Sequence, residues 1–212
     1  MTSTLDISTL TLADVHHHLG LRRQVQESFR PWLDLAPLSE VEQRDLEGIA
    51  ACFYSHYEAG KVAEGEVKFL TLAPLLWQAG YYREGYSISL EEHIASIVLD
   101  DGDTHLRGRM DILITTRQRH GVTTHPLWVL LIEAKNSEVN AISGLPQLLA
   151  YAFRSLNGQP ATWGLATNGM TYQFVHLSAG TPSTYTLFPS LDLTRSDQAG
   201  QVLQVLKAVA IA

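Results

Sequence analysis

The residues best suited to chemistry stand at the end of the most apolar stretch of the chain. In VLLIEAKNS, residues 129–137, one residue separates Glu133 from Lys135. Alternate side chains of a β-strand point to the same side, so a strand here would hold the carboxylate and the ammonium together. Asp111 begins a second aliphatic segment, DILITT, which a hairpin can bring beside the first. The sequence therefore predicts that Asp111, Glu133 and Lys135 converge.

Two carboxylates and one ammonium in one place are suited to phosphodiester hydrolysis. Carboxylates set close together repel each other unless a cation lies between them, and Mg²⁺ prefers such oxygen ligands. A protonated lysine cannot bind the metal, but it can orient a water molecule or stabilise the charge on a phosphoryl group under attack. Taken alone, however, the triplet E-x-K is common on exposed strands and is a weak signal.

The length and composition indicate the architecture that would position these groups. The chain has 212 residues, 45% hydrophobic and 17% charged, which is enough for one well-filled core and short for two. We expect residues 1–212 to form one domain of the α/β or α+β class, with residues 1–60 as an N-terminal helical extension. A mixed central sheet of about five strands would carry helices on both faces and the charged groups at an edge or fork.

The sequence favours a soluble, cytoplasmic protein with limited affinity for nucleic acid. No run of 18 or more apolar residues occurs, and the N-terminus lacks the basic-then-apolar order of a signal peptide. The formal net charge of −7 argues against a broad DNA-binding surface, because Lys and Arg supply most non-specific affinity. Residues 105–154 carry six Lys or Arg against three Asp or Glu, which is a modest local excess of positive charge.

Two helices are expected before the strands. Ser39 and Glu42 form an S-x-x-E capping box that predicts the start of the first. The second is expected from Val62 to Gln78, with an interruption near Pro74. On it, Glu66 shares a stripe with apolar residues at spacings of 3, 4, 7 and 11: Phe69, Leu70, Ala73 and Trp77. A carboxylate on a buried stripe needs a partner, whereas one at the stripe's edge reaches water, and the spacing alone favours the edge.

The remainder of the chain is expected to alternate between strands and helices. Residues 86–116 predict two strands joined at Asp100, Asp101, Gly102 and Asp103, a cluster that lacks the ligand spacing of a calcium loop. After the buried strand come a helix at 142–157 and two strands joined by a type I′ turn at Asn168 and Gly169. A short strand and an amphipathic C-terminal helix follow, and that helix could supply a dimer interface.

The order of these features resembles the PD-(D/E)XK nuclease superfamily: a Glu on a helix, an Asp on a strand, E-x-K on a buried strand and then a helix. Within it, residues 64–177 look most like the N-terminal nuclease domain of the restriction subunit of type I restriction enzymes. The matching segments are EVKFLTLAPLLWQAGY, GRMD, IEAK and LATNGMTYQF. Gln147 and Tyr151 match a Q-x-x-x-Y helix motif, although their spacing alone is equally compatible with a core-facing tyrosine.

The resemblance implies a restriction-endonuclease-like core and a role for each matching residue. Asp111 and Glu133 would bind Mg²⁺, or Mn²⁺ in its place. Lys135 would assist the activation of water, and Glu66 would complete or support the metal site. The residues implied to contact nucleic acid or to brace the metal site are Arg109, Gln147 and Tyr151.

The activity that the resemblance implies is Mg²⁺-dependent hydrolysis of DNA in restriction or defence. Met110 replaces the proline that leads the family signature, which leaves the Asp111 carboxylate intact. The sequence contains no G-x-x-x-x-G-K-[ST] motif for an ATP-driven motor, so the biological role is left open. The alternative is a nucleic-acid-binding or assembly module without cleavage, which the acidic balance favours. RNA and single-stranded or branched DNA are further candidate substrates, and a homodimer or a recruiting protein are candidate partners.

Overall fold

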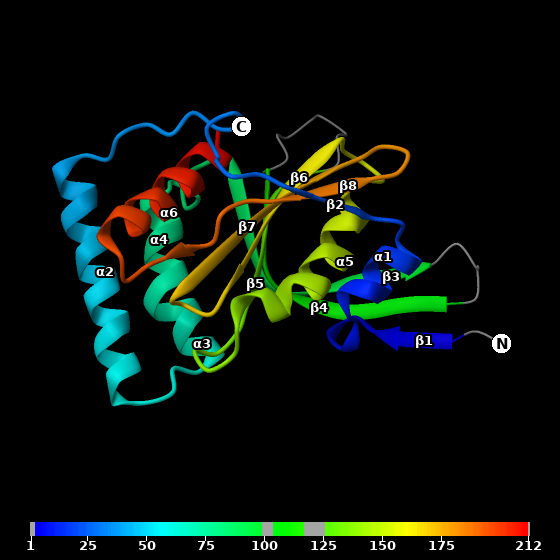
Figure 1. The fold of residues 1–212 in the computed structure, drawn as a ribbon, viewed down its shortest axis with the longest axis horizontal. Helices are drawn as coiled ribbons and strands as arrows, with labels where there is room; N and C mark the ends of the chain where they lie inside the picture. Colours follow the sequence, from blue (N-terminus) through cyan, green and yellow to red (C-terminus); the bar gives the residue numbers. More distant parts are fainter. Residues whose placement is uncertain (1–2, 99–103, 117–125, 212) are drawn as a thin grey trace.

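The computed structural model describes residues 3–98, 104–116 and 126–211, in which helices cover both faces of a mixed β-sheet. Helices α2, α4 and α6 are grouped on one side of the sheet, and α1 and α5 lie on the other (Figure 1). The predicted mixed α/β class is confirmed, and none of the described helices is both long and apolar enough to cross a membrane. The helices are α1 (Leu12–His18), α2 (Glu40–Ala59), α3 (Glu64–Val67), α4 (Ala73–Gln78), α5 (Leu145–Ser155) and α6 (Ser196–Val209).

The sheet has more strands than expected. Its described strands number nine and take the order β1-β4-β5-β6-β7-β8-β2, with β3 paired to β4 and β9 paired to β7. The parallel pair β5–β6 is connected through α5, and the pairs β3–β4, β4–β5 and β6–β7 are antiparallel. The longest described strands are β3 (Tyr86–Val98), β4 (Thr104–Thr116), β5 (Trp128–Ala134), β6 (Ala161–Thr167) and β7 (Thr171–Ser178), and the short β9 spans Leu191–Asp192.

The expected helical extension over residues 1–60 is wrong for its first part. Strand β1 (Ser3–Asp6) pairs in parallel with β4, and β2 (Arg22–Val25) pairs in parallel with β8 (Thr184–Leu187). Both strands satisfy backbone groups on sheet edges that would otherwise be open, which is the physical reason for their pairing. The expected helix after Ser39 is present as α2, with the capping box formed. The N-terminal segment is therefore built into the sheet.

Alternating side chains on the central strands give the sheet two separate cores. On β5, Leu130 and Ile132 belong to the core formed with α4 and α6, whereas Leu131 belongs to the core formed with α5. The apolar stripe of α6 is completely buried in the first core, with Val202, Leu203, Val205 and Leu206. This stripe is used inside the chain, which corrects the expectation that α6 could form a dimer interface.

The connection between β6 and β7 also differs from the expectation. Three residues, Asn168 to Met170, separate the strands, and of these only Gly169 has a positive φ, 88°. A type I′ turn would need two such residues. Instead, the side chain of Asn168 accepts hydrogen bonds from the backbone N–H groups of Met170 and Thr171. The other expected turn, Asp100 to Asp103, lies outside the described residues.

His176 on β7 makes the stability of the fold sensitive to acid. Its ring packs against those of Trp32 and Trp163, with centroid distances of 5.0 and 4.8 Å. Burial lowers the pKa of His176 from 6.5 to about 4. Between these values the unfolded chain binds a proton that the folded chain excludes, so the free energy of unfolding falls as the pH falls. His176→Leu is expected to reduce this dependence in thermal unfolding.

The matched control for this experiment is His56→Leu, because His56 lies exposed on α2. That variant is expected to keep the acid sensitivity of the wild type. If His176→Leu loses stability between about pH 6.5 and about pH 4 as steeply as the wild type, another group causes the effect.

Candidate active site

The candidate site lies at a fork in the sheet, on strand β4. One edge of β4 pairs with β3 along most of its length. The other edge pairs with β1 through Thr104–Arg107 and with β5 through Ile112–Thr115. Between these two ranges the described part of the sheet places no strand against that edge, so other groups can reach residues 108–111. The sequence predicted that the charged residues would lie at an edge or a fork of the sheet, and they lie at a fork.

The strand register brings the predicted charged residues together. Ile112 pairs with Ile132, which sets Asp111 opposite Glu133. Oδ2 of Asp111 accepts a hydrogen bond of 2.7 Å from the backbone N–H of Ala134. Lys135 follows directly after β5, and its Nζ lies 2.6 Å from Oε1 of Glu133. Asp111, Glu133 and Lys135 form a compact group, which we call the fork site.

Glu133 is the most buried carboxylate of the fork site. Its side chain is 3% exposed, and its Oε2 has no hydrogen-bond partner. Desolvation and the nearby charge of Asp111 raise the pKa of Glu133 to about 8, although Lys135 opposes the shift. Close to neutral pH the carboxyl group therefore holds its proton unless a cation compensates the negative charge.

Helix α5 supports the fork site through a chain of hydrogen bonds. Lys135 Nζ donates to Oε1 of Gln147 at 3.3 Å, and Nε2 of Gln147 donates to the hydroxyl of Tyr151 at 3.2 Å. That hydroxyl donates to the backbone carbonyl of Arg109 at 2.8 Å, on the open edge of β4. The side chain of Arg109 instead points to a surface ion pair with Glu91 at 2.8 Å. Gln147 and Tyr151 thus connect Lys135 of the fork site to the backbone of Arg109.

Two glycines allow these elements to approach each other. A Cβ atom on Gly144, just before α5, would lie 2.8 Å from Cγ of Glu133 and 3.3 Å from Cε of Lys135. A Cβ atom on Gly108 would lie 2.5 Å from the hydroxyl of Tyr151. Larger residues would therefore displace the groups that they contact. Sequence reasoning missed both glycines, because their importance depends on contacts between distant segments.

Glu66 does not join the fork site, although the family resemblance implied that it would complete or support the metal site. Its side chain is exposed, and its Oε2 accepts a hydrogen bond of 2.7 Å from the backbone N–H of Ala63 at the start of α3. Phe69 and Trp77, from the same stripe, are 76% and 68% exposed. The helical segment instead buries the face that carries Val67, Thr71, Leu72 and Leu75.

A π-helical turn interrupts this helical segment. Residues Lys68–Leu72 form this turn between α3 and α4, and the N–H of Ala73 bonds to the carbonyl of Lys68 five residues back. Pro74 has no N–H to donate at this point, so the interruption expected there is present. A π turn rotates the residues that follow it relative to an ideal α-helix. The stripe that begins at Glu66 lies on the exposed side of this segment both before the turn, at Glu66, and after it, at Trp77.

Glu64 is the acidic residue that this helix directs toward the fork site. Its Oε1 lies 3.0 Å from Nζ of Lys68, and the same Nζ lies 2.7 Å from Oδ1 of Asp111 and 3.9 Å from Oε1 of Glu91. Burial acts to lower the pKa of Lys68, but its hydrogen bonds to Asp111 and Glu64 outweigh this and raise the pKa. The sequence held a signal for Glu64, at spacings of 3, 7 and 11 from residues of the buried face: Val67, Thr71 and Leu75.

The fork site offers oxygen ligands of the kind that Mg²⁺ prefers. Mg²⁺ often binds through one or two carboxylates and keeps several water molecules, so Asp111 and Glu133 can be sufficient. In the described part of the chain, no three or more His, Cys, Asp or Glu side chains are grouped closely enough to enclose a metal. The buried, unpartnered Oε2 of Glu133 fits a cation, whereas both oxygens of Asp111 already accept hydrogen bonds.

Among the solved structures that resemble this chain is a distant one from a restriction enzyme. No family model and no curated protein matches the sequence. A solved fragment assigned as the HsdR subunit of a type I restriction enzyme from Vibrio vulnificus YJ016 is similar, with a TM-score of 0.40 and 18% identity. The similarity covers 69% of this chain and 26% of that one, so this chain corresponds to about a quarter of the length of the other.

Glu133→Gln is expected to stabilise the ion-free protein at alkaline pH. The pKa of Glu133 rises from 4.5 to about 8 on folding. Between these values the unfolded carboxyl group is ionised while the folded one is protonated, so the free energy of unfolding of the wild type falls as the pH rises. An uncharged amide avoids this loss. Thermal unfolding in EDTA should show the advantage of the variant growing from about pH 5 to about pH 8.5.

Glu138→Gln is the matched control, since the Glu138 side chain is 65% exposed. Its unfolding temperature should follow that of the wild type across the same pH range. A Glu133→Gln variant that also runs parallel to the wild type would contradict the effect of burial on Glu133.

Proposed function

We propose that this chain is a Mg²⁺-dependent endonuclease that hydrolyses DNA phosphodiester bonds at a PD-(D/E)XK-type site. The observation that carries the proposal is the buried carboxylate of Glu133, whose Oε2 has no partner although Asp111 stands opposite. Such a group costs folding free energy when it is ionised without a cation. Strongly perturbed carboxylates of this kind are concentrated at functional sites.

Asp111 and Glu133 are the residues that would hold the ion, and Mn²⁺ could substitute. Bound there, Mg²⁺ supplies a Lewis acid that favours deprotonation of water and offsets the charge of the phosphate. The backbone N–H of Ala134 orients Asp111, and the ammonium of Lys135 orients Glu133. The chain itself thus fixes the ligand oxygens in advance, which reduces the reorganisation that binding would need.

Lys135 is proposed to act on the attacking water or on a phosphate oxygen. Its Nζ donates to Glu133 and to Gln147, which leaves one of the three donors of an ammonium available. Its side chain is 23% exposed, so a substrate group can reach it. Tyr151 restrains Gln147, and Gln147 restrains the ammonium, so the donor is held where negative charge would develop.

The proposed substrate is DNA, contacted over a confined surface. The formal net charge of −7 limits non-specific binding, so we propose that a recruiting protein brings this nuclease to DNA in the cytoplasm. A homodimer would allow two sites to reach both strands of a duplex. Its interface would have to use surface other than the buried apolar stripe of α6.

A nucleic-acid-binding or assembly module without cleavage is the second candidate. It is favoured by the contact of Lys68 with Asp111, in which the ammonium lies 2.7 Å from Oδ1. If this ammonium always stays in place, it neutralises the carboxylate and competes with a metal ion for it. Metal binding separates the candidates, because cleavage requires an ion at Asp111 and Glu133 and the module does not.

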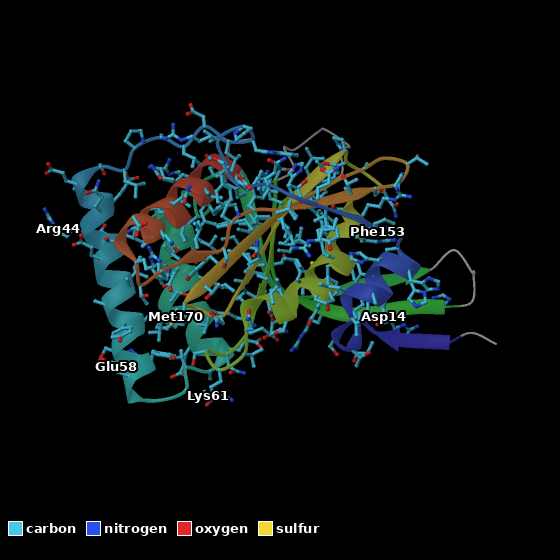
Figure 2. All side chains as sticks on the ribbon, in the orientation of Figure 1. Asp14, Arg44, Glu58, Lys61, Phe153 and Met170 are labelled. Atoms are coloured by element: carbon cyan, nitrogen blue, oxygen red, sulfur yellow. The ribbon has the colours of Figure 1, made fainter. Side chains whose placement is uncertain are left out.

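Lys135→Ala is expected to lower the rate of DNA cleavage in Mg²⁺ by about 100-fold or more, because it removes a donor positioned for the transition state. Nicking of supercoiled plasmid measures this rate, beside linear duplex and single-stranded DNA and with EDTA as the blank. Lys61→Ala is the matched control, since Lys61 forms a surface ion pair with Glu138 at 3.3 Å. Figure 2 shows Lys61 at the periphery, in the segment after α2.

The control variant should cleave like the wild type. Cleavage by Lys135→Ala at the wild-type rate would contradict the role of Lys135. Absence of cleavage by the wild type, together with Mn²⁺ affinity that Asp111→Ala does not change, would favour the module.

Lys68→Ala is expected to strengthen Mn²⁺ binding, because it removes the ammonium that occupies Oδ1 of Asp111. The same change should lower the free energy of unfolding in EDTA by about 1–3 kcal/mol, since Asp111 and Glu64 lose their shared cation. Calorimetric titration measures the first effect and thermal unfolding the second. Lys61→Ala should change neither appreciably, and equal Mn²⁺ affinity of Lys68→Ala and the wild type would contradict the competition.

A further inference from the structure

A cavity of about 390 Å³ opens beside the fork site, between the segment from α3 to α4 and strands β3 and β4. Lys68 and Asp111 belong to its lining, so the cavity shares polar groups with the fork site. Most of the remaining lining is apolar and includes Phe69, Leu76, Ile88 and Leu90. A ligand that fills the cavity with an apolar group can therefore extend an anionic group toward the fork site.

The side chains at this cavity are unusually exposed for their type. Phe69 is 76% exposed, Leu90 is 65% exposed and Tyr82 is 48% exposed. The ring of Tyr82 also lies 5.5 Å from that of the exposed Trp77, which extends the aromatic surface. Contiguous exposed apolar surface beside convergent charged groups is typical of a ligand site. The fold does not bury Phe69 and Trp77, because the helical segment that carries them buries its opposite face.

We propose that the cavity binds an unpaired nucleobase of the DNA strand whose phosphodiester lies at the fork site. This inference rests on the proposed nuclease function and specifies its substrate class. A nucleotide joins an anionic phosphate to a flat, largely apolar base, which matches a charged site next to an apolar cavity. Phe69 and Tyr82 offer aromatic rings for stacking, and the ammonium of Lys135, which has one donor left, offers positive charge for the phosphate.

The size of the cavity selects a single base over a larger occupant. A volume of about 390 Å³ lies near the lower end of the range of about 300–1,000 Å³ that is usual for small-ligand pockets. It is adequate for one base with part of its sugar, and it is too small for a helix or strand of a partner protein. The charged rim also disfavours a purely apolar ligand such as a lipid chain, because Lys68 and Asp111 would be desolvated.

The need for an unpaired base determines which DNA is preferred. Within a duplex, a base is stacked on both faces and exposes only its edges in the grooves. It can enter a pocket only after it leaves the stack, which is easiest in single strands, at frayed ends and at mismatches. The preferred substrate is therefore single-stranded DNA, or duplex DNA with unpaired bases beside the phosphodiester that is cleaved.

Binding of DNA in EDTA tests this proposal separately from cleavage, because EDTA removes the metal ion that the proposed cleavage requires. The probe is a short single-stranded oligonucleotide of thymidines with one central 2-aminopurine, whose fluorescence falls when the base stacks. Wild-type protein should quench the probe and bind it more tightly than the same strand in a duplex. Phe69→Ala should weaken binding by about 5- to 150-fold and abolish most of the quenching. Phe69→Trp should retain both.

The matched control is Tyr54→Ala, because Tyr54 is an exposed aromatic residue of α2, 44% exposed, that does not line the cavity. It should bind the probe like the wild type. Because Phe69 is largely exposed, its replacement should leave the unfolding temperature nearly unchanged. Wild-type binding by Phe69→Ala, no quenching by wild-type protein, or no binding of single strands would each overturn the proposal.

A parallel cleavage assay in Mg²⁺ separates this inference from the function on which it rests. Quenching that depends on Phe69 without any cleavage would support the cavity and contradict the nuclease. Cleavage of duplex DNA by the wild type with no quenching of the probe would contradict the cavity and leave the nuclease in place.

Discussion

The pairing register of β4 with β5 is the constraint on which the rest of the site depends. Side chains alternate between the two faces of a strand, so a slip of one residue would exchange the faces of the whole segment. Leu130, Leu131 and Ile132 are buried in two different cores, and such a slip would place each in the wrong one. The apolar contacts that stabilise the sheet therefore also hold Asp111 opposite Glu133.

The burial of Glu133 determines what its surroundings must supply. An ionised carboxylate removed from water needs hydrogen bonds or a cation, and Lys135 satisfies only one of its oxygens. Gln147 and Tyr151 then hold Lys135 and connect it to the open edge of β4. On the other side of Asp111, Lys68 supplies a second ammonium. The ion-free fold is thus compatible with two buried or partly buried carboxylates, at the expense of a raised pKa for Glu133.

The fork gives the site two different sides. Helix α5 closes one side with hydrogen bonds, while the π-helical segment leaves a mostly apolar cavity on the other. Strand β1 contributes to this division, because it pairs with β4 beyond residues 108–111 and completes the fork. In our proposals, the rigid, polar side carries out the phosphate chemistry, and the open, apolar side beside it holds a base.

The sequence by itself determined the features that depend on neighbouring residues. These include the mixed α/β class, the start of α2 at its capping box and the shared side of Glu133 and Lys135. Tertiary structure alone decided that β1 and β2 join the sheet, because a short exposed strand forms only against an edge that a distant segment supplies. It also decided between Glu64 and Glu66 and set Lys68 against Asp111, 43 residues away. Periodicity cannot settle such choices, since burial and charge pairing depend on elements far apart in the chain.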